Sequence, residues 1–164
     1  MSKKILLVDD ELSILEALSK VWGAEDYEVV LAENGKDAVE KIAAGPIDLV
    51  LLDLGLPVKD GWATLDWLGR INPLLPVIII TGRSEQRKLA EQAGADALME
   101  KPLDLPLLLQ TIRELLNEPL ESRVRRASDA TRGFRYAPCD SVLLREALLK
   151  KLTTSYPCRG PENN

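Results

Sequence analysis

The chain has 164 residues, 46% of them hydrophobic and 29% charged, which fits a single globular domain with a real core. No apolar run approaches the ~20 residues of a membrane span. The short run of residues 5–8 ends on Asp9-Asp10-Glu11, so it predicts a first strand and excludes a signal peptide. The two cysteines, Cys139 and Cys158, indicate no disulfide framework, and we expect a cytoplasmic protein.

Strand and helix patterns alternate five times along the chain. Apolar runs bounded by turn residues predict the strands, and apolar residues at helical spacing predict the helices between them. In chain order the predicted strands are residues 5–8, 28–32, 49–53, 77–80 and 97–99, and the predicted helices are residues 14–22, 38–42, 62–68, 84–93 and 104–116. Five such units with right-handed crossovers give a parallel sheet covered by helices on both faces.

The strand order follows from burial and from charge. Residues 49–52 and 77–80 are wholly apolar, which is typical of central strands covered on both faces. The first strand must also lie inside the sheet, because the acidic pair at its end is expected beside Asp53. These conditions favour an α/β fold of the flavodoxin-like, doubly wound type, with five strands in the order 2-1-3-4-5, five helices and a short C-terminal helical extension.

Polar and charged side chains follow four of these strands at the point where each strand ends. Asp9 and Asp10 follow the first strand, Asp53 ends the third, Thr81 follows the fourth and Lys101 follows the fifth. Carboxyl ends of parallel strands share one edge of the sheet, so these groups should converge. Three carboxylates so close repel one another, and a chain without histidine offers oxygen ligands, so the cluster predicts Mg²⁺. The set suits phosphoryl transfer with Asp53 as the nucleophile.

With these residues the sequence resembles the receiver domain of two-component response regulators. The resemblance covers about residues 3–118, and its motifs have the family's order and spacing. It implies that a sensor histidine kinase or a phosphotransfer protein phosphorylates Asp53, and that the chain acts on a downstream protein and is not an enzyme in its own right. The matching motifs are Val8-Asp9-Asp10-Glu11, Asp53-Leu54-Gly55-Leu56-Pro57 with Asp60-Gly61, Ile80-Thr81-Gly82, Gly94-Ala95-Asp96 and Lys101-Pro102.

The resemblance also implies a role for each residue around Asp53. Asp10 would bind Mg²⁺ directly and Asp9 mainly through water, with Asp53 and the backbone carbonyl of Gly55 as further ligands. The phosphoryl group itself would be contacted by Thr81 and Lys101, and the bond from Lys101 to Pro102 would be cis.

Two positions depart from the family pattern. The family usually has Tyr or Phe three residues before the lysine, and its ring swings inward when the threonine hydroxyl moves to the phosphate; this chain has Leu98. We therefore expect the switch formed by Thr81 and Leu98 to be coupled differently. The residue two after Asp53 is Gly55, which has no side chain to orient or block an attacking water.

The charge changes sign near the end of the last predicted helix. Residues 1–118 contain 12 Lys/Arg and 21 Asp/Glu, a net charge of −9, whereas residues 119–164 contain 9 and 5, a net charge of +4. We predict a basic linker lying over the acidic receiver, followed by an amphipathic helix over residues 142–152 that packs on the receiver or in a homodimer. These 46 residues are too few for a winged-helix output domain. The linker arginines are Arg123, Arg125, Arg126, Arg132 and Arg135.

The sequence is compatible with three classes of function. The first is a signalling receiver that acts by protein–protein contact, and it is preferred. The second is a DNA-binding transcriptional regulator that uses the basic tail, but a single helix is not a helix-turn-helix and a charge of +4 gives at most weak, salt-sensitive binding. The third is a stand-alone phosphotransferase or phosphatase that also uses an aspartyl nucleophile. The haloacid dehalogenase-like phosphatases need a second Asp two residues after the nucleophile, where this chain has Gly55.

Overall fold

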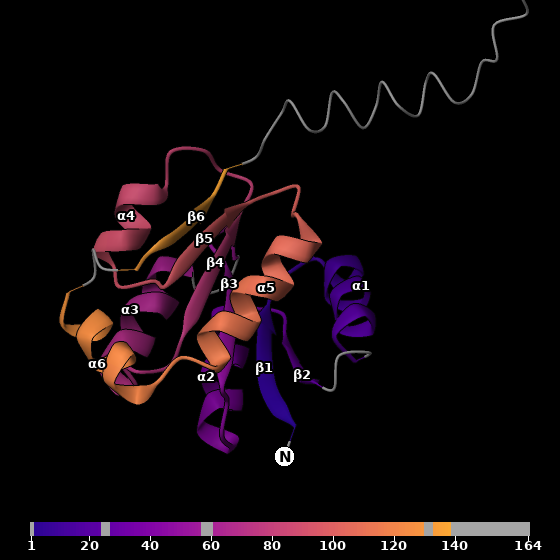
Figure 1. The fold of residues 1–164 in the computed structure, drawn as a ribbon. Coiled ribbons are helices and arrows are strands. Elements are labelled where there is room, and N and C mark those ends of the chain that lie inside the picture. Colours follow the sequence, from indigo (N-terminus) through magenta and orange to yellow (C-terminus); the bar gives the residue numbers. More distant parts are fainter. Residues whose placement is uncertain (1, 24–26, 57–60, 130–132, 139–164) are drawn as a thin grey trace, which may run out of the picture.

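One parallel sheet organises the protein, and β1 and β3 lie next to each other inside it (Figure 1). The computed structural model describes residues 2–23, 27–56, 61–129 and 133–138. Within these ranges the sheet has six strands in the order β2-β1-β3-β4-β5-β6. The strands are β1 (Lys3–Val8), β2 (Tyr27–Ala32), β3 (Leu49–Asp53), β4 (Val77–Thr81), β5 (Ala97–Glu100) and β6 (Arg135–Ala137).

Helices cover both faces of this sheet, as the doubly wound fold requires (Figure 1). Alternate residues of each central strand enter one of two cores: Leu49 and Leu51 pack with α1 and α5, while Val50 and Leu52 pack with α2, α3 and α4. The helices of the described residues are α1 (Leu12–Gly23), α2 (Gly35–Ala44), α3 (Gly61–Ile71), α4 (Arg87–Gln92), α5 (Leu105–Leu116) and α6 (Leu120–Ser128). The predicted fold class and the order of the first five strands are confirmed.

Side chains cap the first turns of two helices. The Asp104 carboxylate accepts a hydrogen bond of 3.0 Å from the amide of Leu107 and so caps α5. Asn34 caps α2 in the same way, accepting from the amide of Asp37 at 2.9 Å. Among the helices that the structure describes, none combines the length and apolar character needed to cross a bilayer.

The stretch after α5 differs from the predicted linker, because it contains the helix α6 and the strand β6. Two arginines of the predicted basic linker form ion pairs with carboxylates of the receiver. Arg126 is only 9% exposed and makes ion pairs with Asp96 and Glu118. Arg135 bonds to Glu114 at 3.1 Å, so the basic stretch does lie over acidic groups. The helix predicted over residues 142–152 lies outside the described residues.

Candidate functional site

The predicted polar residues meet at the carboxyl edge of the sheet. The register places the ends of neighbouring strands beside one another, since Val8 pairs with Leu52, Asp53 with Ile80 and Thr81 with Glu100. A pocket of about 330 Å³ opens at this edge. It is lined by Asp10, Glu11, Asp53, Gly55, Thr81, Gly82, Arg83 and Lys101.

Three carboxylates form the acidic part of this site. Oxygen atoms of Asp9, Asp10 and Asp53 all lie within 4.8 Å of one another. Asp9 is 1% exposed and accepts the amide of Glu11 at 2.9 Å, while Asp53 accepts the amide of Gly55 at 3.0 Å. These amide bonds hold the two buried carboxylates in place at the ends of their strands.

Lys101 reaches the same cluster from the end of β5. Its Nζ lies 3.0 Å from Oδ2 of Asp9 and 3.4 Å from Oδ2 of Asp53. Burial by itself lowers the pKa of Lys101, but the hydrogen bond to Asp9 and the charges of both carboxylates outweigh it and raise that pKa above its ordinary value. Lys101 therefore stays charged, and one positive charge faces three carboxylates.

This donor set fits a hard divalent cation. Carboxylate oxygens without nitrogen or sulfur donors are the ligands that Mg²⁺ prefers, and two charges of the cluster are not balanced by Lys101. The exposed Asp10 faces the pocket, so an ion that keeps several of its waters has room there.

Thr81 completes the site from β4. It is 1% exposed, and its Oγ1 accepts the amide of Arg83 at 3.0 Å. Its carbonyl accepts the amide of Lys101 at 2.8 Å, which joins the ends of β4 and β5. The bond between Lys101 and Pro102 is cis, as the resemblance implied.

Leu98, the other predicted switch residue, does not line the pocket. It is fully buried in the core two residues before Glu100. Its register partner is Tyr136 of β6, which packs against the same core cluster. An aromatic ring therefore lies beside position 98, but it comes from a different strand.

Two glycines shape the space around Asp53. A β-carbon on Gly55 would lie 3.7 Å from Oδ1 of Asp53, an ordinary contact, so the glycine keeps this approach to the carboxylate open. A β-carbon on Gly61 would lie 2.4 Å from the carbonyl oxygen of Asp53, so α3 can start against β3 only with glycine there.

Sequence reasoning did not include Glu11 and Arg83 among the site residues. Both line the pocket. The backbone amide of Glu11 donates to the Asp9 carboxylate, and the backbone amide of Arg83 donates to the Thr81 hydroxyl. The available signal was their position two residues after a strand-end polar group, where a side-chain oxygen often accepts the backbone amide.

Comparisons with known proteins agree with this geometry. The family model of the response regulator receiver domain matches residues 5–133. The transcriptional regulatory protein ZraR of Salmonella typhimurium is 36% identical over 135 residues, covering 79% of this chain and 30% of ZraR. The response regulator MprA of Mycobacterium bovis is 34% identical over 138 residues, covering 80% of this chain and 60% of MprA. The chain thus spans about a third of the length of ZraR and less than two thirds of the length of MprA.

Solved structures of response regulators and their receiver domains are also similar to this chain. A receiver domain protein from Methanospirillum hungatei, described as CheY-like, has a TM-score of 0.68 at 30% identity, covering 77% of this chain and 99% of that one. The response regulator TrrA of Thermotoga maritima, solved with Mg²⁺ and BeF, has a TM-score of 0.64 at 33% identity, covering 69% of this chain and 98% of that one.

Proposed function

Since the chain belongs to the response regulator receiver domain family, we propose that Asp53 is its phosphoacceptor and that the phosphorylated chain acts by contact with a downstream protein. The donor is a sensor histidine kinase or a phosphotransfer protein. The observation that carries this assignment is the position of the Asp53 carboxylate, which lines an open pocket 3.4 Å from Nζ of Lys101 and within 4.8 Å of the other two acidic groups.

The transfer is a displacement at phosphorus. An oxygen of Asp53 attacks the phosphorus of the donor's phosphohistidine, the new O–P bond forms, the P–N bond breaks, and the imidazole leaves. Lys101 turns its ammonium from the carboxylates toward the phosphoryl oxygens and neutralises their charge. A hydroxyl that accepts one hydrogen bond can still donate its own hydrogen, so Thr81 is suited to donate to a phosphoryl oxygen.

The cofactor of this proposal is Mg²⁺, held by Asp9, Asp10, Asp53 and the carbonyl of Gly55. When bound, it supplies positive charge against the phosphoryl oxygens. The three carboxylates that would hold it are already gathered, so little rearrangement of the chain is needed.

An apolar groove of about 420 Å³ beside the site suits the phosphodonor. Ile14, Ala17 and Leu18 of α1 line one side, and Pro102 and Leu103 line the other, next to Lys101. Because the groove is continuous with the lysine of the site, an apolar helix of the kinase docked there would bring its phosphohistidine to Asp53. Kinases reach such a partner in the cytoplasm, which is the location we propose.

The DNA-binding alternative rests on the name of ZraR and on the basic tail. The described tail gives it little support, because three of its four described arginines are already engaged. Arg126 and Arg135 pair with carboxylates, and Arg123 donates to the carbonyls of Leu115 and Leu116 at 3.1 Å each. We assign residues 1–118 to the receiver domain and regard residues 119–164 as an extension, of which α6 and β6 pack back onto it.

The test is incubation with acetyl phosphate and Mg²⁺ followed by intact-mass measurement. Wild type should gain one acid-stable, base-labile phosphoryl group, and the Asp53→Asn variant should gain none. Equal phosphorylation of both proteins would show that Asp53 is not the acceptor.

A further inference from the structure

β6 covers the outer edge of β5, which would otherwise end the sheet (Figure 1). It pairs in parallel, with Ala97 opposite Arg135, Leu98 opposite Tyr136 and Met99 opposite Ala137. The amide of Arg135 donates to the carbonyl of Asp96 at 3.1 Å. An open edge presents unpaired backbone groups to any extended segment, so this short strand occupies a surface suited to binding.

Side chains attach β6 to three neighbouring elements. The Tyr136 hydroxyl donates to Glu100 of β5 at 2.9 Å, and the guanidinium of Arg87 from α4 lies 5.0 Å from the centre of its ring. Arg135 donates to Glu114 of α5 at 3.1 Å. Such partly exposed pairs are each weak, and all three residues of β6 are only half-buried.

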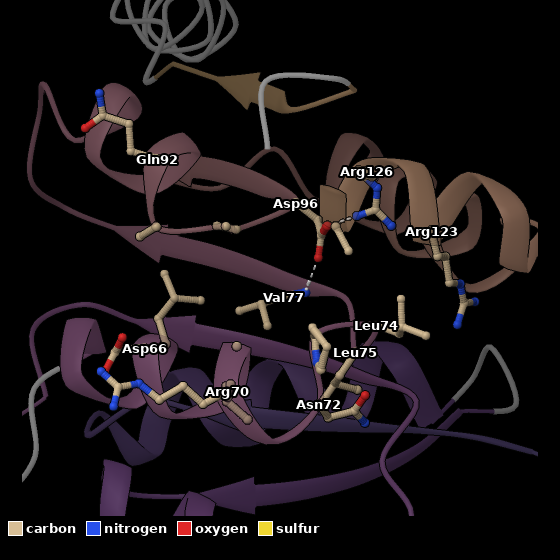
Figure 2. A pocket seen from close by; sticks show the side chains of 18 residues that line it. Asp66, Arg70, Asn72, Leu74, Leu75, Val77, Gln92, Asp96, Arg123 and Arg126 are labelled. Carbon is tan, nitrogen blue, oxygen red and sulfur yellow. Dashed lines mark hydrogen bonds and ion pairs between the residues drawn. The ribbon is translucent and has the colours of Figure 1, made fainter. Parts of the chain in front are cut away.

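α6 is anchored by the ion pairs of the buried Arg126, whereas the side-chain pairs of β6 are partly exposed. Figure 2 shows Arg126 against Asp96, at the rim of a cavity of about 350 Å³ bordered by α3, α4 and α6. Asp96 also accepts the amide of Val77 at 2.7 Å, so this ion pair is built into the start of β4. Gly133, with φ of 80°, precedes β6, so the firm anchor and the weak strand are separated by a residue in a conformation that favours glycine.

The weak strand is joined to the phosphorylation site through Glu100. Glu100 is the register partner of Thr81 and the residue before Lys101, whose amide bonds to the Thr81 carbonyl. Since side chains alternate along a strand, Thr81 and Glu100 point to the same face as Leu98 and its partner Tyr136. A movement of Thr81 and Lys101 toward a phosphoryl group would therefore act on the backbone of Glu100, whose carboxylate accepts the Tyr136 hydroxyl.

We propose that the β5 edge is a regulated interaction surface, that Phe134–Ala137 occupies it in the unphosphorylated chain, and that phosphorylation of Asp53 releases this segment while α6 stays bound. The inference rests on the proposed phosphorylation of Asp53. The exposed edge, flanked by Glu100 and Glu114, accepts an extended partner segment with a basic and an aromatic residue in adjacent positions, the chemistry of Arg135-Tyr136.

Hydrogen exchange with mass spectrometry on the full chain tests the release. The chain is compared in buffer with Mg²⁺ alone and with Mg²⁺ and beryllofluoride, and separately after acetyl phosphate. Protection of the amides of residues 134–137 should fall by about 5- to 150-fold, the usual range of coupling between two sites. Protection of Ser122–Ser128 in α6 should not change.

Tyr136→Phe keeps the ring and removes the bond to Glu100, so residues 134–137 should exchange faster before phosphorylation. Coupling is reciprocal, so this variant should also bind beryllofluoride at lower concentration in fluorine NMR. Arg125→Gln, on the exposed side of α6, is the control and should match wild type in both measurements.

The outcomes separate the two proposals. If intact mass shows the phosphoryl group and residues 134–137 keep their protection, the release is wrong and the phosphoacceptor assignment stands. Loss of protection in α6 together with β6 also overturns the inference, because the anchor would not exist. Absence of the phosphoryl group overturns the assignment of Asp53 and the release with it.

Discussion

Gly61 starts α3 directly against the backbone of Asp53, so closely that a β-carbon would stand 2.4 Å from the Asp53 carbonyl oxygen and 2.5 Å from the Cα of Leu54. The first atoms that a side chain would meet are backbone, which cannot rotate away. The position of α3 and the position of Asp53 are therefore fixed by the same close contact.

Gly61→Ala should lower the free energy of unfolding by about 1–3 kcal/mol, the usual cost of forcing atoms into a filled space. Its control is Gly69→Ala in the same helix, where nothing lies within 4 Å of the new β-carbon. That variant should stabilise the chain by about 0.5–1 kcal/mol, because alanine is the better helix former. Urea denaturation measures both. Equal stability of the two variants would contradict the close packing of α3 on β3.

Removal of one charge tests the acidic cluster. Asp10 is exposed and lines the pocket, so Asp10→Asn should relieve repulsion without removing a partner of Lys101. Without metal the variant should be more stable than wild type by about 1 kcal/mol, the size of one such pair interaction near water. Wild type should gain about 2.7 kcal/mol when free Mg²⁺ reaches a hundred times its Kd, and the variant should gain much less at that concentration.

Thermal unfolding in EDTA and in Mg²⁺ gives both quantities. Ca²⁺ and K⁺ at the same ionic strength separate specific binding from screening. The acidic cluster would not be a metal site if Mg²⁺ raised the melting temperature of Asp10→Asn as much as that of wild type.

The fold and the site were predictable because the strongest sequence signals determine both. Two wholly apolar strands bury both of their faces only in the middle of a parallel sheet. A parallel sheet brings the carboxyl ends of all its strands to one edge. Asp53 and Lys101, 48 residues apart, are brought together by that rule alone, and their atoms do lie 3.4 Å apart.

The extension was not predictable in the same way. β6 has three residues, too few to show a periodic pattern, although Phe134 and Tyr136 stand two apart and both pack on one core cluster. An arginine run is usually a solvated surface, and nothing local shows that Arg126 has Asp96 as a partner. Such pairs depend on where the chain turns, which sequence periodicity does not encode.

The bond between Tyr136 and Glu100 has a pH dependence of known sign. Donation to Glu100 raises the pKa of Tyr136 above 10.0, and burial and the carboxylate's charge add to the effect. A raised pKa means that the neutral phenol stabilises the docked strand fully below pH 10.0, and that this contribution is lost as pH rises through the folded pKa.

Ultraviolet absorbance of tyrosinate measures this, as the difference between titrations of wild type and Tyr136→Phe. The difference curve should have its midpoint above 10.0, and Glu100→Gln should bring it back toward the ordinary value. A midpoint at or below the ordinary value in wild type would mean that the hydroxyl does not donate to Glu100.

Arg126 should contribute more to stability than any other described residue of the extension. It is 9% exposed and lies between Asp96 and Glu118, so Arg126→Ala leaves the buried Asp96 and the partly buried Glu118 without their cation. Removing one partner of a buried ion pair costs about 3–5 kcal/mol, since the remaining charge keeps its desolvation penalty. After the substitution Asp96 still accepts the amide of Val77, which favours the lower end of that range.

The control is Arg125→Ala, one residue earlier and exposed, which should change the free energy of unfolding by no more than about 0.5 kcal/mol. Urea denaturation of the full chain compares the two variants. Similar small losses for both would mean that α6 is not anchored through Arg126, and a strand released alone from a fixed α6 would then have no structural basis.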